Sequence, residues 1–471
     1  MKKAEITAFL SLVFVLLVSF VLGMLEITVI HTAGNLSRLA VDRAVFSVFG
    51  EYQRNLLEDY HIFSIEGSYG TGDFSEERLT SRMHYYGSSG IGHEITAIQY
   101  LTDNRGQAFR EQVLEYMEDQ YGIGLIRDFT GLTGEWEEES IQGQKMEEAE
   151  ETILHGYEEI KAASEAKETE GSAVPADDGQ DGNPFGFVEQ IRKSGLLSLV
   201  MPKDMELSGL QIRQEEQASH RQLRTGRGSF PMRQSTGVED RLLYDEYVLR
   251  HFSSAAGLPE GSTSEDFAGR SLAYEVEYII EGKSSDKENL ESVLGKIFLV
   301  RMALNYGYLL GDSGKKAEAS ALALTITALL LIPEMWEAAE QLILLAWAAG
   351  ESIVDIRTLL SGEKAPLIKN ARNWQLPLSS LLIFGSGSED IAGTDVEDGI
   401  SYQEYLRAFL FLKDPDEVTM RTLDRIEENL ASEHGLKYFR ADQCITRTEI
   451  QNTAEILGGI TYTFPVWFGY G

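Results

Sequence analysis

The sequence predicts a mainly helical α+β protein. We expect an N-terminal transmembrane helix that continues into a long amphipathic helix, a helical extracellular body, and a small antiparallel sheet with a C-terminal hairpin. Three observations support this class. Residues 6–25 carry no charge. Between residues 240 and 432, apolar residues recur at spacings of three and four, which indicates helices. Apolar residues alternate near the C-terminus, which indicates paired strands.

The apolar run ITAFLSLVFVLLVSFVLGML at 6–25 is the predicted membrane anchor. Its length as a helix is about 30 Å, which matches the hydrocarbon core of a bilayer. Lys2 and Lys3 precede the run and Glu26 follows it, so we expect a cytoplasmic N-terminus and an extracellular body. The cytoplasmic membrane, crossed once, is therefore an expected partner. The anchor residues include Ile6, Phe9, Leu12, Leu16, Phe20 and Leu25.

A cleaved signal peptide is the alternative. Its apolar region is usually only about 7–15 residues long and ends in a small-x-small site. The one such site here, a poor one, lies around Ala33. Helical spacing also continues beyond the apolar run, which predicts one unbroken helix ending near Tyr60 and favours a retained anchor. The positions that carry this spacing are Ile30, Ala33, Ser37, Ala40, Ala44 and Val48.

The charge balance excludes one class of partner. The chain of 471 residues has 75 acidic and 41 basic residues, a net charge of -34. Because nucleic acids attract positive charge, we expect no nucleic-acid partner. Cys444 is the single cysteine, so no intramolecular disulfide can form and an exported body must rely on its hydrophobic core.

Four consecutive segments are expected. They are a membrane anchor at 1–30, an N-terminal helix with a small α/β region at 31–133, an acidic helix with flexible linkers at 134–238, and a helical core with a C-terminal hairpin at 239–471. The second segment contains a Gly/Ser-rich loop at 66–75, a strand at 94–101 and a helix at 107–122.

The third segment is predicted to hold little core. Residues 134–170 are rich in glutamate, which favours a solvated helix, and residues 169–186 have the composition of a flexible linker. We expect a loose loop at 203–238. Its arginines could instead bind an acidic surface such as phospholipid or a cell-wall polymer. They are Arg213, Arg221, Arg224, Arg227 and Arg233.

Helix starts are marked clearly in the fourth segment. Ser285 with Glu288, and Ser401 with Glu404, have the spacing of capping boxes. Asp414 followed by a proline resembles an N-cap with proline at the first helical position. Helices are expected at about 240–254, 269–282, 286–310, 315–332 and 334–360.

Residues 319–332 (ASALALTITALLLI) invite a second membrane crossing. The run is only 14 residues long and ends at Pro333, so we interpret it as a buried core helix packed on residues 343–349. At the end of the chain, Gly458 and Gly459 separate the two strands of the predicted hairpin. The face that the hairpin should bury carries Tyr462, Phe464, Val466 and Phe468.

No catalytic, cofactor-binding or metal-binding residue is predicted. The run Gly311-Asp312-Ser313-Gly314 matches the residues around a trypsin-like nucleophile, but lysines follow it and no histidine base is marked. His93-Glu94 has no second histidine at helical spacing and so is not a zinc motif. Two acidic clusters resemble calcium loops in composition only, and we interpret both as solvated loops. They are Asp177, Asp178 and Asp181, and Asp395, Glu397 and Asp398.

Two N-terminal segments carry a resemblance to a known family. KKAEITAFLSLVFVLLVSFVLGMLE and RLAVDRAVFSVFGEYQRNLLEDYHIFSIEG resemble the exported Firmicutes proteins of the uncharacterised family known as domain of unknown function 5702. The likeness continues in EYVLRHFS, LAYEVEYIIEGKSSDKENL, KKAEASALAL, SIVDIRTLLSGEKAPLIK and ISYQEYLRAFLFL, and so covers most of the chain.

The resemblance also implies a likeness to the minor pseudopilins of tight-adherence (Tad) pilus systems. These proteins likewise begin with a short polar head, an apolar helix and an extracellular body. Pilins carry a glutamate near the processed N-terminus that can neutralise a neighbour's amine. Glu5 is the only acidic residue in that region and is the assembly candidate. The sequence departs from the pilin pattern because no glycine precedes a plausible cleavage point, which argues against peptidase processing.

The expected function is therefore structural and not enzymatic. The favoured hypothesis is a single-pass, membrane-anchored extracellular protein that is a pseudopilin-like component in Tad pilus assembly, with other pilus or pseudopilin subunits as partners. The alternative is an anchored cell-surface binding module for a wall polymer or partner protein. An extracellular hydrolase is a distant third, and no cofactor is expected.

Overall fold

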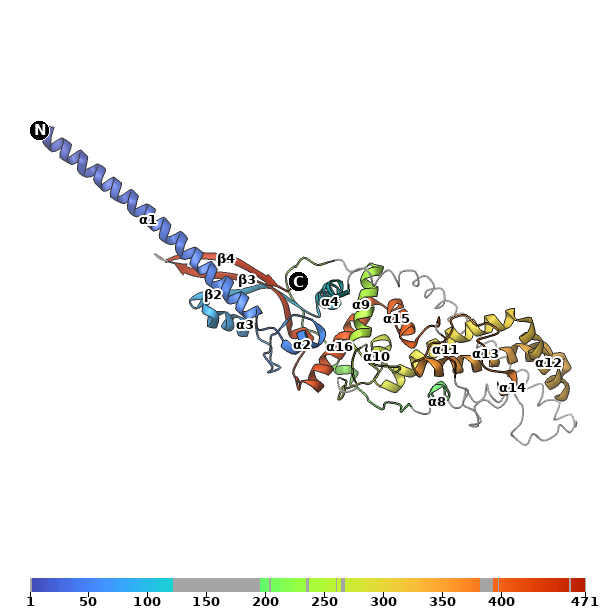
Figure 1. Cartoon of the computed structure of the whole chain (residues 1–471). Helices are drawn as coiled ribbons and strands as arrows, with labels where there is room; N and C mark the ends of the chain where they lie inside the picture. The colour runs from blue at the N-terminus through green and yellow to red at the C-terminus, as the bar shows by residue number, and fades with distance from the viewer. Residues whose placement is uncertain are drawn as a thin grey trace. The chain divides into compact units, whose positions relative to one another are not determined.

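The chain folds into two units, each assembled from segments that are far apart in the sequence. The computed structural model describes residues 2–121, 195–202, 205–233, 237–259, 261–263, 267–381, 393–396, 398–456 and 459–470. Unit 1 comprises Met1–Asp119, Gln217–Ser235 and Leu423–Gly471, and unit 2 comprises Gln120–Glu216 and Thr236–Thr422. Figure 1 shows the elements of both units. The acidic segment 134–170 and the linker 169–186 lie outside the described residues.

The N-terminal helix α1 runs without interruption over Lys2–Phe49, which confirms that the apolar run and the amphipathic run form one helix. It ends at Phe49, and the prediction of an end near Tyr60 is wrong. The backbone N–H of Gln53 donates to Ser64 at 2.8 Å, so the chain leaves the helical path at this point. The Gln53 side chain then caps a separate helix, α2 (Arg54–Tyr60), by accepting from the N–H of Asn55.

A small antiparallel sheet lies beside α1. It comprises β1 (Ile65–Glu66), β2 (Ile91–Tyr100), β3 (Cys444–Ile456) and β4 (Ile460–Gly469). The strand β3 pairs with β2 along one edge and with β4 in the predicted C-terminal hairpin. In this register Asn452 on β3 lies opposite both His93 on β2 and Phe464 on β4. The pairing of β2 with β3 brings the two ends of the chain into one unit.

The core of unit 1 forms between α1 and this sheet. The inward side of α1 contributes Val41, Ala44, Val45 and Val48, all at most 1% exposed. The hairpin face that the sequence predicted, with Phe464 at its centre, packs against the same cluster. The unit also contains α3 (Glu76–Met83), a π-helical turn η1 (His84–Ser88), α4 (Asp103–Tyr121) and η4 (Ala441–Gln443).

Unit 2 is helical in its described residues. Its helices are α8 (Leu196–Val200), η2 (Gln214–Glu216), α9 (Val238–His251), α10 (Glu275–Glu281), α11 (Asp286–Gly311), α12 (Ser313–Leu329), η3 (Pro333–Met335), α13 (Trp336–Leu360), α14 (Leu378–Leu381) and α15 (Tyr402–Leu412). The helix α16 (Pro415–Glu433) begins in unit 2, and its residues from Leu423 belong to unit 1.

Local hydrogen bonds explain where these helices begin. Ser401 and Glu404 form the predicted capping box, whereas Ser285 makes only half of one, because the carboxylate of Glu288 accepts from the Ser285 hydroxyl and not from its backbone. The helix expected at 269–282 starts only at Glu275. The Asp286 carboxylate accepts from the backbone N–H groups at positions 273 and 274 and holds that stretch in a non-helical turn.

The run at 319–332 is not a fully buried helix, which corrects the prediction. One face of α12 is buried, formed by the small residues Ala319, Ala323 and Thr327, and it packs on α13. The opposite face is open, with Leu324 and Leu329 exposed by 52% and 70%. The core helix of unit 2 is α13, in which all residues from 342 to 356 are buried.

A network of buried charges joins α11, α13 and the loop after α13. Lys369 donates to Glu351 at 2.6 Å and lies 2.7 Å from Asp355. Arg301 donates to the same Asp355 at 2.6 Å. All four side chains are at most 2% exposed. Two positive and two negative charges balance inside the core, so no charge in the network is left without a counter-charge.

Candidate functional site

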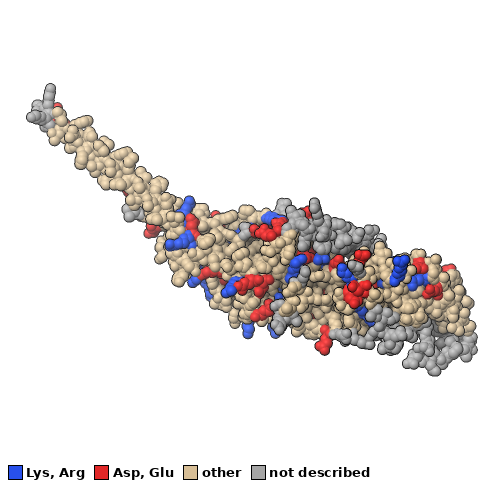
Figure 2. All heavy atoms as spheres, in the orientation of Figure 1, with Lys and Arg blue, Asp and Glu red and all other residues tan. Residues whose placement is uncertain are grey.

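The most conspicuous surface of the protein is the first half of α1. In Figure 2 this part of the helix is not covered by other elements and shows no charged side chain along the apolar run. An apolar window within Glu5–Phe49 is 0% buried. All six anchor residues named from the sequence are more than half exposed; they are Ile6, Phe9, Leu12, Leu16, Phe20 and Leu25. An apolar surface of this size is compatible with a single membrane anchor and also with a signal sequence.

Among the described residues, one other helix is long and apolar enough to cross a membrane, namely α11. Half of its apolar window is buried inside the protein. It also carries Arg301 and Asn305, both fully buried and hydrogen-bonded to Asp355. These contacts are those of a core helix, and α12, the run that the sequence suggested as a second crossing, is only 17 residues long.

The apolar surface of α1 continues past the length that a bilayer needs. Leu36, Leu39 and Phe46 are exposed by 61%, 64% and 69%. Helical geometry places them on the side of α1 away from the buried residues Val41 and Val45. We call these three residues the outer stripe. Phe46 also makes an edge-to-face contact with Phe468 on β4, with 6.2 Å between ring centroids, and the exposed residues Asn35 and Arg43 lie on the same side of α1. The second half of α1 therefore packs on the sheet with one face and exposes a partly apolar stripe on the other.

Glu5 lies in the first turn of α1 and is exposed. A carboxylate is electrostatically favourable at a helix N-terminus, where backbone N–H groups lack helical partners. Among the side chains that the structure describes, which begin at Glu5, none forms an ion pair with it. Its predicted role in assembly therefore depends on a group outside this chain.

A serine, a histidine and an asparagine form a hydrogen-bonded chain in unit 1. Ser88 Oγ lies 2.7 Å from Nε2 of His93, and His93 Nδ1 lies 2.6 Å from Oδ1 of Asn452. The Asn452 amide donates to two strand carbonyls, which leaves Oδ1 as the acceptor. The imidazole consequently carries its proton on Nδ1 and accepts from the Ser88 hydroxyl at Nε2, the tautomer that a nucleophilic serine requires.

This arrangement is nevertheless closed to substrates. Ser88 is 0% exposed, and a hydroxyl without access to a substrate cannot act as a nucleophile. The chain of hydrogen bonds instead ties the π-helical turn to β2 and β3. The sequence did not predict the hydrogen bond between His93 and Asn452, because the two residues are 359 positions apart.

The burial of His93 predicts a pH dependence of stability. Burial lowers the pKa of His93, the hydrogen bond with Asn452 partly opposes this, and the neighbouring His84 lowers it further. Below about pH 6.5 the unfolded chain then binds more protons than the folded chain, so stability falls as the pH falls. Thermal unfolding should show a weaker acid dependence in His93→Gln than in the unchanged protein. The exposed residue His31 supplies the control, and an equal effect of His31→Gln would contradict the assignment.

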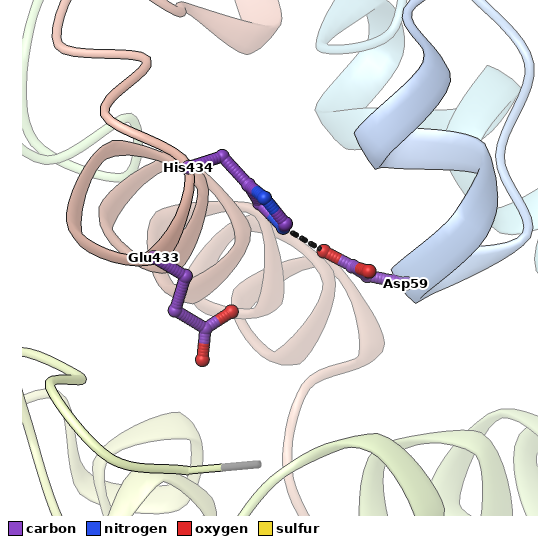
Figure 3. A group of neighbouring side chains, drawn as sticks. All are labelled: Asp59, Glu433 and His434. Atoms are coloured by element: carbon purple, nitrogen blue, oxygen red, sulfur yellow. Dashed lines mark hydrogen bonds and ion pairs between the residues drawn. The ribbon is translucent and has the colours of Figure 1, made fainter. Parts of the chain in front are cut away.

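A second histidine lies beside two carboxylates. Asp59 comes from α2, and Glu433 and His434 come from the end of α16 (Figure 3). Nε2 of His434 lies 2.6 Å from Oδ2 of Asp59. One ligand atom from each of the three residues can be chosen so that all lie within 4.8 Å of one another. The sequence did not single out this cluster, because Asp59 and His434 are 375 positions apart.

An open pocket of about 690 Å³ lies where α3 meets the end of α1. It is lined by Glu51, Tyr69, Glu77, Arg78, Ser81 and Arg82. Arg82 forms an ion pair with Glu51 in its wall. The lining includes guanidinium and carboxylate groups, but most of its exposed surface is apolar, so the pocket suits a ligand that has both an apolar part and a charged group.

The arginine-rich segment is ordered where the structure describes it, so the expectation of a loose loop is wrong. Arg221 donates to Glu427 and Asp442 at 2.7 Å each. The other pairs are Arg213 with Glu216, Arg227 with Glu76, and Arg233 with Glu118, and Arg224 lies over the ring of Phe74. These side chains neutralise acidic groups of the protein itself, which removes the main argument for binding an acidic surface.

The remaining motifs have structural roles where they are described. Asp312 caps α12 by accepting from the backbone N–H groups of Gly314 and Lys315, as expected for a helix junction. Asp395 accepts from the backbone N–H of Lys364. Residue 397 and the cluster at 177–181 lie outside the described residues.

Comparison with known proteins identifies one family. A family model described as a family of unknown function (DUF5702) matches residues 175–456. The match begins after α1. No curated protein and no solved structure matches the chain.

Proposed function

The chain belongs to this family of unknown function, so no relative supplies an activity, and we propose a function from the features of the protein itself. We propose that it is a single-pass, membrane-anchored extracellular structural protein of bacteria, a pseudopilin-like component of Tad pilus assembly. In this proposal α1 serves both as the membrane helix and as the surface that contacts neighbouring subunits.

The outer stripe of α1 is the observation that carries the proposal. The helix has 48 residues and a length of about 72 Å, whereas the bilayer core needs about 30 Å. A helix that served only as an anchor would expose polar side chains beyond the membrane. Here Leu36, Leu39 and Phe46 are exposed as well, among the exposed polar residues Asn35, Asp42 and Arg43. A partner helix packed along α1 would cover them.

The energies indicate how such packing could work. Burying one fully exposed large apolar side chain contributes about 1.5–3 kcal/mol, so the three residues of the outer stripe, which are about two thirds exposed, supply about 3–6 kcal/mol. Association of free molecules costs about 4–15 kcal/mol in lost motion. The stripe alone is therefore marginal in solution. Two subunits held in one membrane have already lost part of that freedom, which makes the same stripe sufficient.

The continuity of α1 favours a retained helix over a removed leader. Its buried residues begin at Gly34, which lies against the ring of Tyr462. Any cleavage must therefore occur before this point if the core is to stay intact. Cleavage near Ala33 would leave a new chain end at the edge of the core. The outer stripe would survive in either case.

A membrane-anchored binding module is the second candidate, and the open pocket at the end of α1 favours it. The guanidinium and carboxylate groups in its lining would suit a charged group of a wall polymer or partner protein. This function needs no outer stripe and gives Glu5 no role. The two candidates therefore differ in what α1 should do.

Substitution of Glu5 tests the proposal. In a filament, Glu5 would lie against the N-terminal amine of a neighbour, and Glu5→Gln removes that attraction. We expect pilus yield to collapse while the amount of membrane-bound protein stays the same. Glu26→Gln, at the other end of the apolar run, is the matched control and should assemble normally.

The anchored-module function predicts the opposite result for Glu5→Gln. In an anchored module Glu5 is solvated beside Lys2 and Lys3, where an ion pair contributes about 0–1 kcal/mol. Unchanged pili in the Glu5→Gln strain, with an N-terminus that still starts at Met1 by mass spectrometry, would rule out the pilin-like role of this residue.

A further inference from the structure

We propose that Asp59, Glu433 and His434 bind one divalent transition-metal ion, with Zn²⁺ as the best match. The site lies within unit 1 and does not depend on the proposed function. Figure 3 shows the imidazole of His434 directed at the Asp59 carboxylate, whereas the Glu433 side chain leaves the same helix end with its carboxylate turned away from that contact. Rotation of the Glu433 side chain would bring this carboxylate to the metal.

The donor set selects the class of metal. One imidazole nitrogen and two carboxylate oxygens are ligands that Zn²⁺ accepts in four-coordinate sites, with water in the fourth position. Calcium prefers six to eight oxygen ligands, and magnesium keeps most of its water, so the imidazole argues against both. A neutral imidazole and two carboxylates carry a charge of -2, which a divalent cation balances.

The distances are within reach of a metal-bound arrangement. Zinc ligands bound at about 2.0–2.2 Å lie about 3.3–3.6 Å from one another in a tetrahedron. The contact between His434 and Asp59, now 2.6 Å, would have to open slightly, and the other separations, which are at most 4.8 Å, would have to close by at most about 1.4 Å. The side chains of Asp59 and His434 are each 31% exposed, so rotation about their torsions can supply these shifts.

The frame beneath the ligands is rigid. Asn429 Nδ2 donates to the hydroxyl of Tyr60 at 3.1 Å, and both residues are at most 1% exposed. This buried bond holds α2 against α16 one residue from Asp59 and four residues from Glu433. The backbone N–H of His434 closes the last turn of α16 by donating to Leu430. Ligands held on such a frame lose little freedom when a metal binds.

The electrostatic surroundings also favour a cation. Asp59 lies in the last turn of α2, and Glu433 is the last residue of α16. Both helices therefore direct the negative ends of their dipoles toward the cluster. The net charge of -34 adds a general attraction for cations. That general attraction is not site-specific. The experiment must therefore separate binding at the cluster from nonspecific binding to the acidic protein.

Metal titration of the full chain in detergent micelles tests the site. The protein is stripped with a chelator and titrated with Zn²⁺ in competition with a chromophoric chelator, at physiological salt and neutral pH. We expect one competitive site per chain, and an affinity about tenfold or more lower in His434→Ala and in Asp59→Asn. His31→Ala, which removes an exposed histidine on α1, should bind like the unchanged protein.

A second readout excludes misfolding as the cause. In the presence of chelator, the unchanged protein and His434→Ala should melt at similar temperatures, and Zn²⁺ should raise the melting temperature of the unchanged protein alone. The proposal is overturned if the unchanged protein shows no saturable site, or if His434→Ala binds Zn²⁺ with the same stoichiometry and affinity. Equal displacement of Zn²⁺ by Ca²⁺ would also overturn the choice of metal.

Discussion

Replacing Lys369 with methionine is expected to lower the free energy of unfolding by about 3–5 kcal/mol, the cost of removing one partner from a buried ion pair. Methionine fills a similar volume but carries no charge. Asp355 would keep Arg301, and Glu351 would keep only the backbone N–H groups at 375 and 376. Glu351 would thus be a buried carboxylate that has lost its ion-pair partner.

Chemical denaturation of the full chain in detergent, followed by tryptophan fluorescence, measures this loss. Trp347 is fully buried in α13, the helix that carries Glu351 and Asp355, and its Nε1 donates to Leu376 O. Its emission therefore reports on the surroundings of the charge network. Lys316→Met is the matched control. Lys316 is 47% exposed and lies 4.0 Å from Glu340, so its loss should change stability by only about 0–1 kcal/mol. Similar losses in both variants would contradict the network as described.

Placing a charge on the outer stripe is expected to abolish assembly without unfolding the protein. In Leu39→Glu, a carboxylate would have to be desolvated wherever a partner helix packs on α1, and an unpaired buried charge is strongly unfavourable. Leu39 is exposed on the side of α1 away from the core, so unit 1 should fold normally. Pilus yield should fall to background, while membrane-bound protein and its circular dichroism spectrum stay unchanged.

Tyr438→Glu is the control for this effect. Tyr438 is 61% exposed, close to the 64% of Leu39, but it lies outside α1. The substitution adds the same charge to an equally exposed aromatic site. Loss of pili in both strains would point to a general effect of charge or expression. Normal pili in the Leu39→Glu strain would show that the outer stripe has no partner.

Local patterns in the sequence were enough to predict most elements. The 3.6-residue spacing runs from the apolar segment into the residues at 33–48, and α1 follows it without a break. The capping signal at Ser401 and the alternation in the last strand also correspond to observed structure. Each of these features depends on residues that are close together in the chain, where steric and hydrogen-bonding preferences act directly.

The features that the sequence did not reveal depend on distant residues. Arginines among Gln, Ser and Gly resemble a solvated loop, and only the fold brings Glu427 and Asp442 to Arg221. The run at 319–332 resembles a core helix because composition does not show which face has a partner. In α12 the small residues pack and the leucines stay exposed.

Among the candidate sites, too, those formed by neighbouring residues could be predicted from the sequence and those formed by distant residues could not. Glu5 and the six anchor residues could be named from the sequence, because an apolar run and its polar head are contiguous. The outer stripe could not, since Leu36, Leu39 and Phe46 have the same spacing as buried residues on the other face. The cluster of Asp59 and His434 joins positions from the two ends of the chain, and no local pattern predicts such a meeting.

Photo-crosslinking from position 39 in living cells tests whether a partner helix covers the outer stripe of α1. Leu39 is replaced by a photoactivatable phenylalanine analogue, with the same replacement at Tyr438 as the control. The proposal predicts an adduct from position 39 whose partner peptide maps to the N-terminal helix of a second copy or of another pilin-like subunit, and none from position 438. Efficient incorporation at position 39 with no protein adduct after irradiation would contradict the account.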